Sequence, residues 1–360
     1  MARLKEYNGH YCESEYEYAF IGFLEAEGWK YSSGNNIHRV TKRDVLIADD
    51  FKKFIADTNL DLTEDEVTQI YDNVRLVGAE SDFATLHKVY GWMVNGVQFT
   101  PQDGLPRMIP LIDFDNWDKN IFHVVNQFTV EYTNNGQKEN RRPDVLLFVN
   151  GMPLCVVELK NPADANATIY DAWEQINIRY WRDIPHLLHY CPLACISDGV
   201  KTRLGTVRTP YEHFYAWRRV TEGDAVSTLP FAETETMIKG VYAPERFLEI
   251  FRDYIYFQDS IYDSDEVEIV CRYPQFFAAR LLKQSIIKSV VEKSGKGGTY
   301  FGATGCGKTY TMAFLARQLA LRCIDIPEIG SPTIILIVDR DELQKQGSKL
   351  FTKSKEFLNL

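Results

Sequence analysis

The sequence predicts an α/β protein, with a mixed central sheet in its N-terminal part and a second α/β unit with parallel strands after it. The first observation is a pair of apolar runs, residues 145–149 and 153–159, on either side of Asn150-Gly151. Asn-Gly favours a two-residue type I′ hairpin turn because both turn positions need positive φ. The second is residues 333–338, a continuous apolar run typical of a strand buried in a parallel sheet. Helical patterns between the strands complete the α/β arrangement.

Composition limits the class of protein. At 360 residues, the chain is long enough for two or three domains, and its 45% hydrophobic and 25% charged residues are ordinary for a soluble globular protein. No N-terminal apolar segment and no apolar run of about 18 residues is present, so we expect neither a secretory signal nor a membrane span. The seven Cys lack metal-ligand spacing, which predicts a reducing, cytoplasmic location.

The net charge of −10 argues against general attraction to nucleic acid. An enzyme of this composition that acts on DNA must concentrate positive charge locally. One stretch has enough basic residues to do so: Arg141, Arg142, Lys160, Arg179, Arg182, Lys201, Arg203 and Arg208. The alternative is that these are solvated surface charges.

The N-terminal part contains the helices and strands of the expected mixed sheet. Residues 13–28 form an amphipathic helical pattern that ends in Gly, and residues 61–77 contain a second helix with Thr63 as its N-cap. The other predicted elements are a strand at 122–132, a turn at 133–140, a helix at 167–181 and a short buried strand at 194–196.

A connecting helix at 244–257 begins with Pro244, a residue favoured in the first helical turn. The second unit is then predicted to contain a helix at 272–290, a strand at 299–301, a helix at 310–322 and the strand at 333–338. We therefore expect a domain at 1–225, a helical linker at 226–265 and the N-terminal part of a further domain at 266–360.

The hairpin carries the first chemical signal. Side chains alternate along a strand, so Glu158 and Lys160 face the same side, and the turn brings Asp144 back towards them. Two carboxylates, together with the carbonyl of Leu159, suit a hard cation such as Mg²⁺. The adjacent ammonium can orient or polarise a water molecule. This combination predicts metal-assisted phosphodiester hydrolysis.

The pattern P-D-x(n)-[DE]-x-K is short, and the alternative is a surface hairpin with solvated Glu158 and Lys160. Glu158, however, lies within an apolar run, which indicates an interior strand. A buried acid and lysine are costly unless they are paired or bound to metal.

Residues 302–309 carry the second signal, because they read G-x-x-x-x-G-K-[ST] and open a helix. Backbone N–H groups and a helix N-terminus suit a phosphate, Lys308 reaches the β- and γ-phosphates, and the Thr309 hydroxyl binds Mg²⁺. The residues expected to hold the nucleotide are Gly302, Gly305, Gly307, Lys308 and Thr309.

Together these motifs resemble the N-terminal part of the restriction (R) subunit of type I restriction–modification systems. Residues 142–162 resemble the nuclease block of that family. The resemblance implies a PD-(D/E)xK endonuclease domain in which Asp144, Glu158 and Lys160 are catalytic.

Residues 172–185 resemble the next block of the family, which implies a catalytic role for Gln175. The family has a Tyr four residues after this Gln. In this sequence Arg179 stands at that spacing, and Tyr180 follows one residue later.

The second unit resembles the start of a RecA-like domain of superfamily 2 helicases. Residues 272–275 resemble the glutamine motif, which implies that Gln275 contacts adenine, and residues 338–346 resemble motif Ia. No acidic Walker B box follows Thr309. We therefore expect a fragment with an inactive ATPase.

The resemblance implies an ATP-dependent type I site-specific deoxyribonuclease subunit that uses Mg²⁺ and ATP. Its implied partners are double-stranded DNA and the methyltransferase (M) and specificity (S) subunits, with no membrane. One alternative is a translocase whose N-terminal domain only binds DNA, and another is an inert assembly module. Glu15 and Glu17 either add an acidic group to the nuclease site or belong to a solvated helix face.

Overall fold

The computed structural model describes residues 13–337 apart from 79, 103, 162–167, 227–231 and 259–265, and also residues 351 and 355–358. The chain divides into two compact units, residues 1–248 and 249–360, which are described separately. The stretch that resembles motif Ia, residues 338–346, lies outside the described residues.

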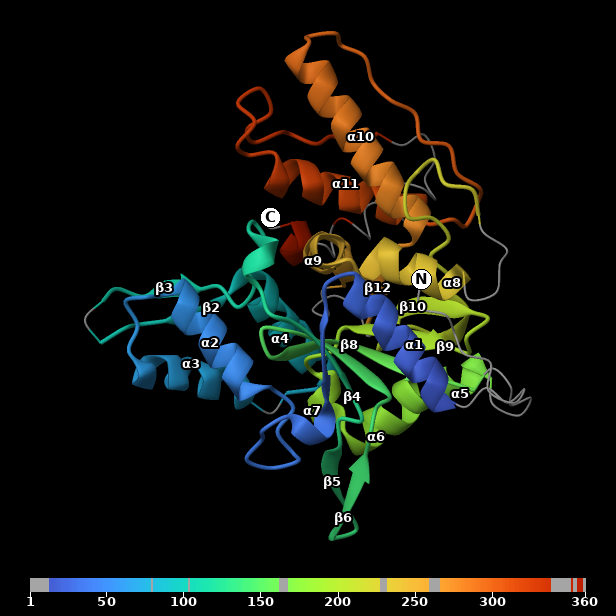
Figure 1. Cartoon of the computed structure of the whole chain (residues 1–360). Helices are drawn as coiled ribbons and strands as arrows, with labels where there is room; N and C mark the ends of the chain where they lie inside the picture. Colours follow the sequence, from blue (N-terminus) through green and yellow to red (C-terminus); the bar gives the residue numbers. More distant parts are fainter. Residues whose placement is uncertain are drawn as a thin grey trace. The chain divides into compact units, whose positions relative to one another are not determined.

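A six-stranded mixed sheet forms the centre of the first unit, as the sequence predicts (Figure 1). Its order is β1-β4-β7-β8-β9-β10. The β1–β4 and β8–β9 pairs are parallel, and the other neighbours are antiparallel. The strands are β1 (Lys30–Ser33), β4 (Phe122–Asn126), β7 (Val145–Val149), β8 (Met152–Leu159), β9 (Leu193–Ser197) and β10 (Thr202–Thr206).

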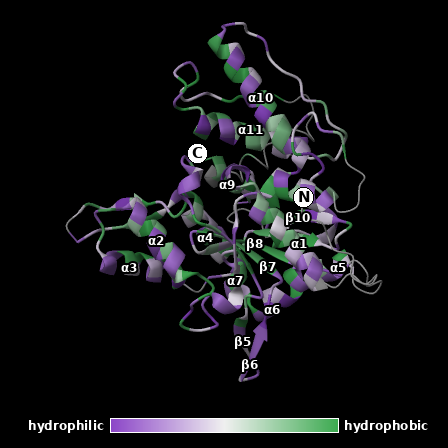
Figure 2. Cartoon of the chain, viewed as in Figure 1, coloured by the Kyte–Doolittle hydropathy of each residue, from purple (hydrophilic) through white to green (hydrophobic). Residues whose placement is uncertain are grey.

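The predicted hairpin joins β7 to β8. Asn150 and Gly151 have φ of 50° and 75°, as a type I′ turn requires. Every residue of both strands is buried, which places the hairpin in the interior of the sheet. Hydrophobic residues accordingly concentrate on the central strands (Figure 2).

Helices pack along the sheet. The predicted first helix is α1 (Glu13–Ala26), which contacts β1, β4 and β8, while α5 (Ile169–Glu174) contacts β8 and β9. The helix predicted at 167–181 continues beyond α5 as a π-helix, η3 (Gln175–Tyr180), and then α6 (Trp181–Asp183). The remaining helices of the unit are α2 (Ala48–Thr58), α3 (Glu64–Arg75), α4 (Asp82–Asn95), α7 (Pro185–Leu188), α8 (Ala232–Met237) and the π-helix η5 (Ile238–Tyr242), with short 3₁₀ turns at Gly34–Asn36, Trp117–Lys119 and Tyr211–His213.

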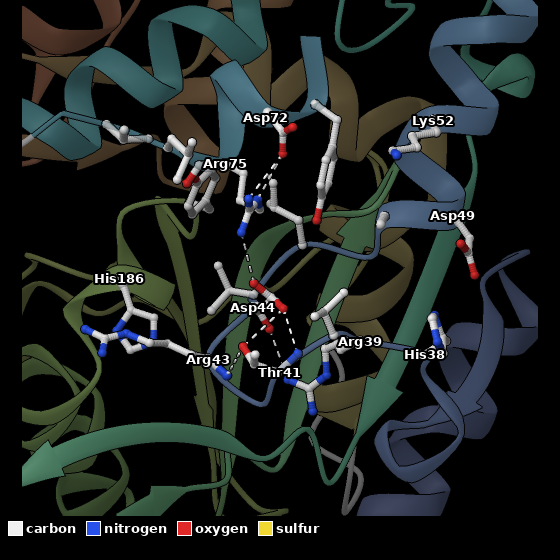
Figure 3. Close-up of a pocket in the computed structure, with 18 of the residues that line it drawn as sticks. His38, Arg39, Thr41, Arg43, Asp44, Asp49, Lys52, Asp72, Arg75 and His186 are labelled. Atoms are coloured by element: carbon white, nitrogen blue, oxygen red, sulfur yellow. Dashed lines mark hydrogen bonds and ion pairs between the residues drawn. The ribbon is translucent and has the colours of Figure 1, made fainter. Parts of the chain in front are cut away.

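The start of α2 contacts the hairpin turn, because Ile47 N donates to Gly151 O at 2.8 Å, and α3 packs against α2. The predicted N-cap Thr63 starts α3 with a capping box to Glu66. A pocket lies between α3 and the segment that precedes α2 (Figure 3). The two-stranded β2 (Val97–Phe99) and β3 (Arg107–Ile109) follow α4.

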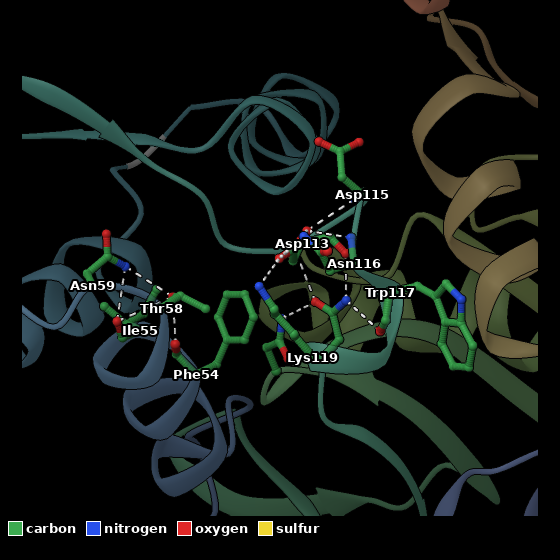
Figure 4. Close-up of polar contacts among 11 residues, drawn as sticks. Phe54, Ile55, Thr58, Asn59, Asp113, Asp115, Asn116, Trp117 and Lys119 are labelled. Carbon is green, nitrogen blue, oxygen red and sulfur yellow. Dashed lines mark hydrogen bonds and ion pairs between the residues drawn. The ribbon is translucent and has the colours of Figure 1, made fainter.

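A polar loop at residues 111–121 forms hydrogen bonds with Asn150 at the turn. The Asn150 amide donates to Leu111 O (2.9 Å) and Asn120 Oδ1 (2.8 Å), and its Oδ1 accepts from Ile121 N. The loop itself is ordered by Asp113, whose Oδ1 accepts from the N–H groups of two following residues (Figure 4). Buried backbone groups at the turn therefore have partners.

Two predictions between β1 and the hairpin were wrong. The strand predicted at 122–132 is broken by Gln127 at φ 54°, which ends β4 and starts β5 (Val130–Asn134). The turn predicted at 133–140 is confined to Asn135-Gly136, and its flanks belong to β5 and to β6 (Gln137–Arg141), which pair with each other. The polar composition suggested a loop, but a two-stranded ribbon with exposed sides needs few apolar residues.

In the second unit the predicted helices form, whereas its described residues contain no parallel sheet. The helices are α10 (Tyr273–Val291) and α11 (Lys308–Arg322), with α13 (Lys355–Leu358) near the end. The predicted 244–257 helix is α9 (Pro244–Asp253), followed by strand β11 (Ile255–Phe257), which pairs with β12 (Glu268–Val270).

The strands predicted at 299–301 and 333–338 are absent over 299–301 and 333–337, the described part of those ranges. A strand needs a neighbour for its backbone hydrogen bonds, and no described residue pairs with either segment. Ile335 and Ile337 are consequently 76% and 88% exposed. Within the described residues, no helix combines the length and the apolar character needed to cross a membrane.

Candidate active site

The sheet brings Asp144, Glu158 and Lys160 to one end of the β7–β8 hairpin. Asp144 directly precedes β7, and its Oδ2 accepts a hydrogen bond from Leu159 N at 2.8 Å. Lys160 directly follows β8, where its N–H donates to Ser197 O at 2.8 Å on the neighbouring strand. Backbone pairing thus fixes the positions from which all three side chains project.

Glu158 is fully buried and held by two donors. Tyr180 Oη donates to its Oε1 (2.5 Å), and Gln175 Nε2 donates to its Oε2 (2.7 Å). Burial raises the pKa of the Glu158 carboxyl well above its usual range, and the nearby charge of Asp144 raises it further. A cation beside this carboxyl would offset both effects.

Lys160 is the nearest cationic side chain to Glu158. Its Nζ lies 3.9 Å from Glu158 Oε2 and donates to Gln175 Oε1 at 2.9 Å. The Gln175 amide therefore bridges the two residues: its oxygen accepts from Lys160, and its nitrogen donates to Glu158. All of these residues can be singled out from the sequence, but this bridge follows only from the fold.

The π-helix η3 determines whether the side chain of Arg179 or that of Tyr180 lies against Gln175. A π-helix pairs residues five apart, where an α-helix pairs residues four apart. Gln175 Nε2 consequently meets Tyr180 Oη at 2.8 Å. Arg179 instead points to solvent, 53% exposed and 3.8 Å from Glu174. The one-residue shift in the sequence was the signal for this π-helix.

Of the two acids considered on α1, Glu17 lies at this site and Glu15 is exposed. Glu17 is buried and accepts from Asn126 Nδ2 (2.5 Å) and Gln127 Nε2 (3.0 Å). Burial raises the pKa of the Glu17 carboxyl, and the charge of Asp144 adds to this effect. Gln127, whose φ is positive, also donates its N–H to Asp144 O at 3.3 Å.

The donor set at this end of the sheet is made of oxygens. Among the described residues, no group of three or more His, Cys, Asp or Glu is placed to hold a metal ion. Asp144 and Glu158, with the carbonyl of Leu159, are the oxygen donors that the sequence predicts here, and Glu17 adds a further carboxyl near Asp144. Such donors suit Mg²⁺.

The second unit places the residues of the phosphate-loop motif directly before α11. Gly307 caps the helix at φ 81°, and Lys308 begins it. Lys308 Nζ donates to Gly302 O and Ala303 O, both at 2.8 Å, so the lysine folds back on its own loop. Gly305 lies in this loop, and Thr309 follows in the first turn of the helix.

Gln275 reaches this loop from α10. Its Nε2 donates to Gly307 O at 3.0 Å, and its Oε1 accepts from Arg272 N at 2.8 Å. A Cβ at position 307 would lie 2.3 Å from Gln275 Nε2, so this approach requires glycine. The fold thus joins two motifs that are 32 residues apart.

Two family models match the chain. One, described as type I restriction enzyme R protein N terminus, matches residues 11–213. The other, described as SWI2/SNF2 ATPase, matches residues 274–359.

Curated relatives include two that align with most of the chain. The putative type I restriction enzyme MjaIXP endonuclease subunit of Methanocaldococcus jannaschii is 29% identical, over 93% of this chain and 34% of its own length. The type I restriction enzyme HindI endonuclease subunit of Haemophilus influenzae is 29% identical, over 96% of this chain and 33% of its own length. The chain spans about a third of the length of these relatives.

Proposed function

The chain belongs to the family of type I restriction enzyme R protein N termini, and we propose that its first unit is a PD-(D/E)xK nuclease that cuts double-stranded DNA. Relatives named as endonuclease subunits support this reading. The observation that carries it is the fully buried Glu158, placed beside Lys160 and Asp144 at one end of a hairpin. A purely structural hairpin gains nothing from burying a carboxyl there, because desolvation of that group is costly.

In this proposal Asp144, Glu158 and the carbonyl of Leu159 hold one or two Mg²⁺ ions. When bound, Mg²⁺ would lower the pKa of a coordinated water and stabilise charge on the scissile phosphate. Lys160 positions the attacking water and offsets negative charge that develops on the phosphate. Gln175 fixes the positions of the Lys160 and Glu158 side chains relative to each other through its two hydrogen bonds. Tyr180 holds the other oxygen of Glu158.

The second unit is proposed to bind ATP. The match of residues 274–359 to an ATPase model supports this, as do the contacts between Gln275 and the phosphate loop. Lys308 would exchange its hydrogen bonds to Gly302 and Ala303 for the β- and γ-phosphates, and Thr309 would bind Mg²⁺. Gln275 would contact adenine.

In the whole protein, ATP binding is proposed to drive DNA translocation, with cleavage following from it. Target recognition would lie with the methyltransferase (M) and specificity (S) subunits, since the relatives are named as subunits of type I restriction enzymes. The local basic residues near the hairpin would then contact DNA without reading its sequence.

The test uses the full-length subunit assembled with its partner subunits. We expect Asp144→Asn and Lys160→Ala to reduce Mg²⁺-dependent cleavage of duplex DNA by at least about a hundredfold, while ATP hydrolysis continues. Glu25→Gln, which removes an exposed carboxyl on α1, is the matched control and should cut normally. Normal cleavage by either site variant would contradict the assignment.

A translocase whose first unit only binds DNA predicts a different result. In that case neither Asp144→Asn nor Lys160→Ala would alter any product, because no phosphodiester would be cut at this site. Calorimetric titration of the 360-residue chain with Mn²⁺ separates the two readings further. A nuclease site loses metal affinity in Asp144→Asn, whereas a DNA-binding or assembly module shows no difference.

A further inference from the structure

A pocket of about 740 Å³ in the first unit lies outside the hairpin site. Most of residues 38–49 line it, together with the end of α3, a residue of α7 and the segment after α7 (Figure 3). Its volume falls within the usual range for ligand pockets. The lining includes four Lys or Arg side chains and three His side chains: Arg39, Arg43, Lys52, Arg75, His38, His186 and His189.

Most of the cationic side chains in this pocket are already engaged. Arg39 packs 3.8 Å above the Phe128 ring and donates to Asp44 O. Arg75 pairs with Asp72 at 3.2 Å and with Asp44 at 3.5 Å. Arg43 differs: it is exposed, and its guanidinium has no hydrogen-bond or ion-pair partner within the part of the chain that the structure describes.

His186 lies beside Arg43 and has a buried ring nitrogen without a partner. Its Nε2 makes no hydrogen bond among the described residues, and buried polar atoms of this kind ordinarily have one. Burial, together with the charges of Arg43 and His189, lowers the pKa of His186 to about 4. The positive charge of Arg43 thus lies beside the ring, whereas His189 is paired with Asp82 at 2.8 Å.

The carboxylates that line the pocket do not pair with the Arg43 guanidinium. Asp44 accepts from Thr41 N (2.8 Å) and Oγ1 (3.1 Å) in addition to its pairing with Arg75. Asp72 is also paired with Arg75. Asp49 lies on the opposite side of the pocket from His186 (Figure 3).

We propose that Arg43 and His186 form a phosphate-binding subsite. A phosphate oxygen can accept from the Arg43 guanidinium and from an Nε2–H of His186, which supplies both missing partners. The favoured source of the phosphate is the backbone of duplex DNA, so this part of the inference rests on the proposed function.

The neighbouring surface favours DNA over a free anion. Arg43 and His186 also line a second cavity of about 620 Å³, together with Arg141, Arg182 and residues of β5 and β6. The two acids of this cavity are engaged: Glu139 accepts from Tyr132, and Asp183 pairs with Arg141 and Arg182, each at 2.7 Å. Arg141 is three positions before Asp144, so this second cavity borders the strand that leads into the hairpin site. A duplex held at the hairpin site would carry further phosphates across such a surface.

The first arm of the test measures how the affinity of the protein for duplex DNA depends on salt concentration. Divalent cations are left out so that no cleavage occurs. Each lost phosphate contact lowers the slope of log affinity against log salt by about 1, or about a three- to fourfold difference between 50 and 200 mM salt. We expect this change for Arg43→Gln. Arg43→Lys, which keeps the charge, should restore most of the slope. Arg218→Gln, an exposed arginine outside the pocket, should leave the slope unchanged.

The second arm titrates inorganic phosphate and follows the ring nitrogens of His186 by NMR, with His186→Gln to assign the signals. A phosphate-induced shift that disappears in Arg43→Gln supports the subsite. If that shift occurs but the DNA slope is unchanged, the source is free phosphate and the DNA part is wrong. If neither changes, the subsite is overturned. Neither arm depends on cleavage of DNA. Failure of the subsite can therefore be told apart from failure of the proposed nuclease function, which separate cleavage assays measure.

Discussion

The hairpin site and the phosphate loop differ in how the fold holds them. At the hairpin, β7 and β8 are paired on both sides within a six-stranded sheet, so each reactive side chain projects from backbone that is already hydrogen-bonded. At the phosphate loop, the expected flanking strands are absent over the described residues, and Lys308 is satisfied by carbonyl groups of its own loop. The first site is organised by the sheet, whereas the second is organised by α10, α11 and local contacts.

This contrast predicts different sensitivities to mutation. Changes at the hairpin should act through packing and buried charge, and should therefore alter stability as well as activity. Changes at the phosphate loop should alter ligand binding with little effect on folding. Four experiments test this difference, in order of decreasing expected effect.

The largest effect is expected for Gly151→Ala. Its φ is 75°, and an added Cβ would lie 2.2 Å from Ile47 O, which belongs to the backbone and cannot move freely. The strain and this clash together should lower the free energy of unfolding by about 3 kcal/mol or more. Gly136→Ala, at φ 80° with no atom nearby, is the control and should cost about 1–2 kcal/mol. Equal losses in chemical denaturation would show that the turn is not constrained by packing.

Lys308→Ala tests the second site. Removing the ammonium that we propose to bind phosphate should weaken ATP binding by about a hundredfold, since charge-assisted contacts to phosphate are among the stronger hydrogen bonds. Lys308 is exposed, so the midpoint of thermal unfolding should hardly change. A fluorescent ATP analogue and calorimetry would measure the two quantities, with Lys296→Ala, an exposed lysine before the loop, as the control. A large fall in stability would contradict the proposed contrast.

Glu158 should make the first unit sensitive to pH. Because the folded pKa of Glu158 is raised above its ordinary value of 4.5, the folded state binds this proton more tightly than the unfolded state does. In the metal-free chain its contribution to stability is therefore present below pH 4.5 and is lost as pH rises through the raised pKa. Mg²⁺ competes with this proton, so metal affinity should rise up to about tenfold per pH unit until Glu158 is ionised.

Glu158→Gln checks this assignment. The variant should flatten the pH dependence of unfolding over that range and weaken Mg²⁺ binding. Denaturant titrations across pH, with and without Mg²⁺, would measure both effects. An unchanged pH profile would show that another group carries the titration, and Glu17, whose pKa is also raised, is the first to examine.

Tyr180→Phe should have the smallest of the four effects. It removes one hydrogen bond to Glu158 and one contact with Gln175, which should reduce cleavage by about tenfold. Arg179→Ala should cut normally, because Arg179 points to solvent. If the two variants reversed this order, η3 would not have the π-helical register described.

Much of the first unit could be predicted from local sequence. Asn150-Gly151, Thr63 and the apolar runs around the hairpin act over a few residues, and each formed the element expected of it. The nucleotide motif was likewise found at the start of a helix. The break at Gln127 was missed because its positive φ is stabilised by contacts with Glu17 and Asp144, which are distant in sequence.

By itself, the sequence determined the hairpin, the acids and the lysine at its end, and the phosphate-loop motif, because these depend on turn chemistry and on alternation along a strand. Only the tertiary structure decided that Gln175 bridges Lys160 and Glu158 and that Tyr180 rather than Arg179 completes the site. Over the part of the chain that the structure describes, it also left residues 333–337 without a paired strand. The physical reason is common to all three: a π-helical turn, a bridging amide and a sheet partner each depend on groups that the local sequence does not contain.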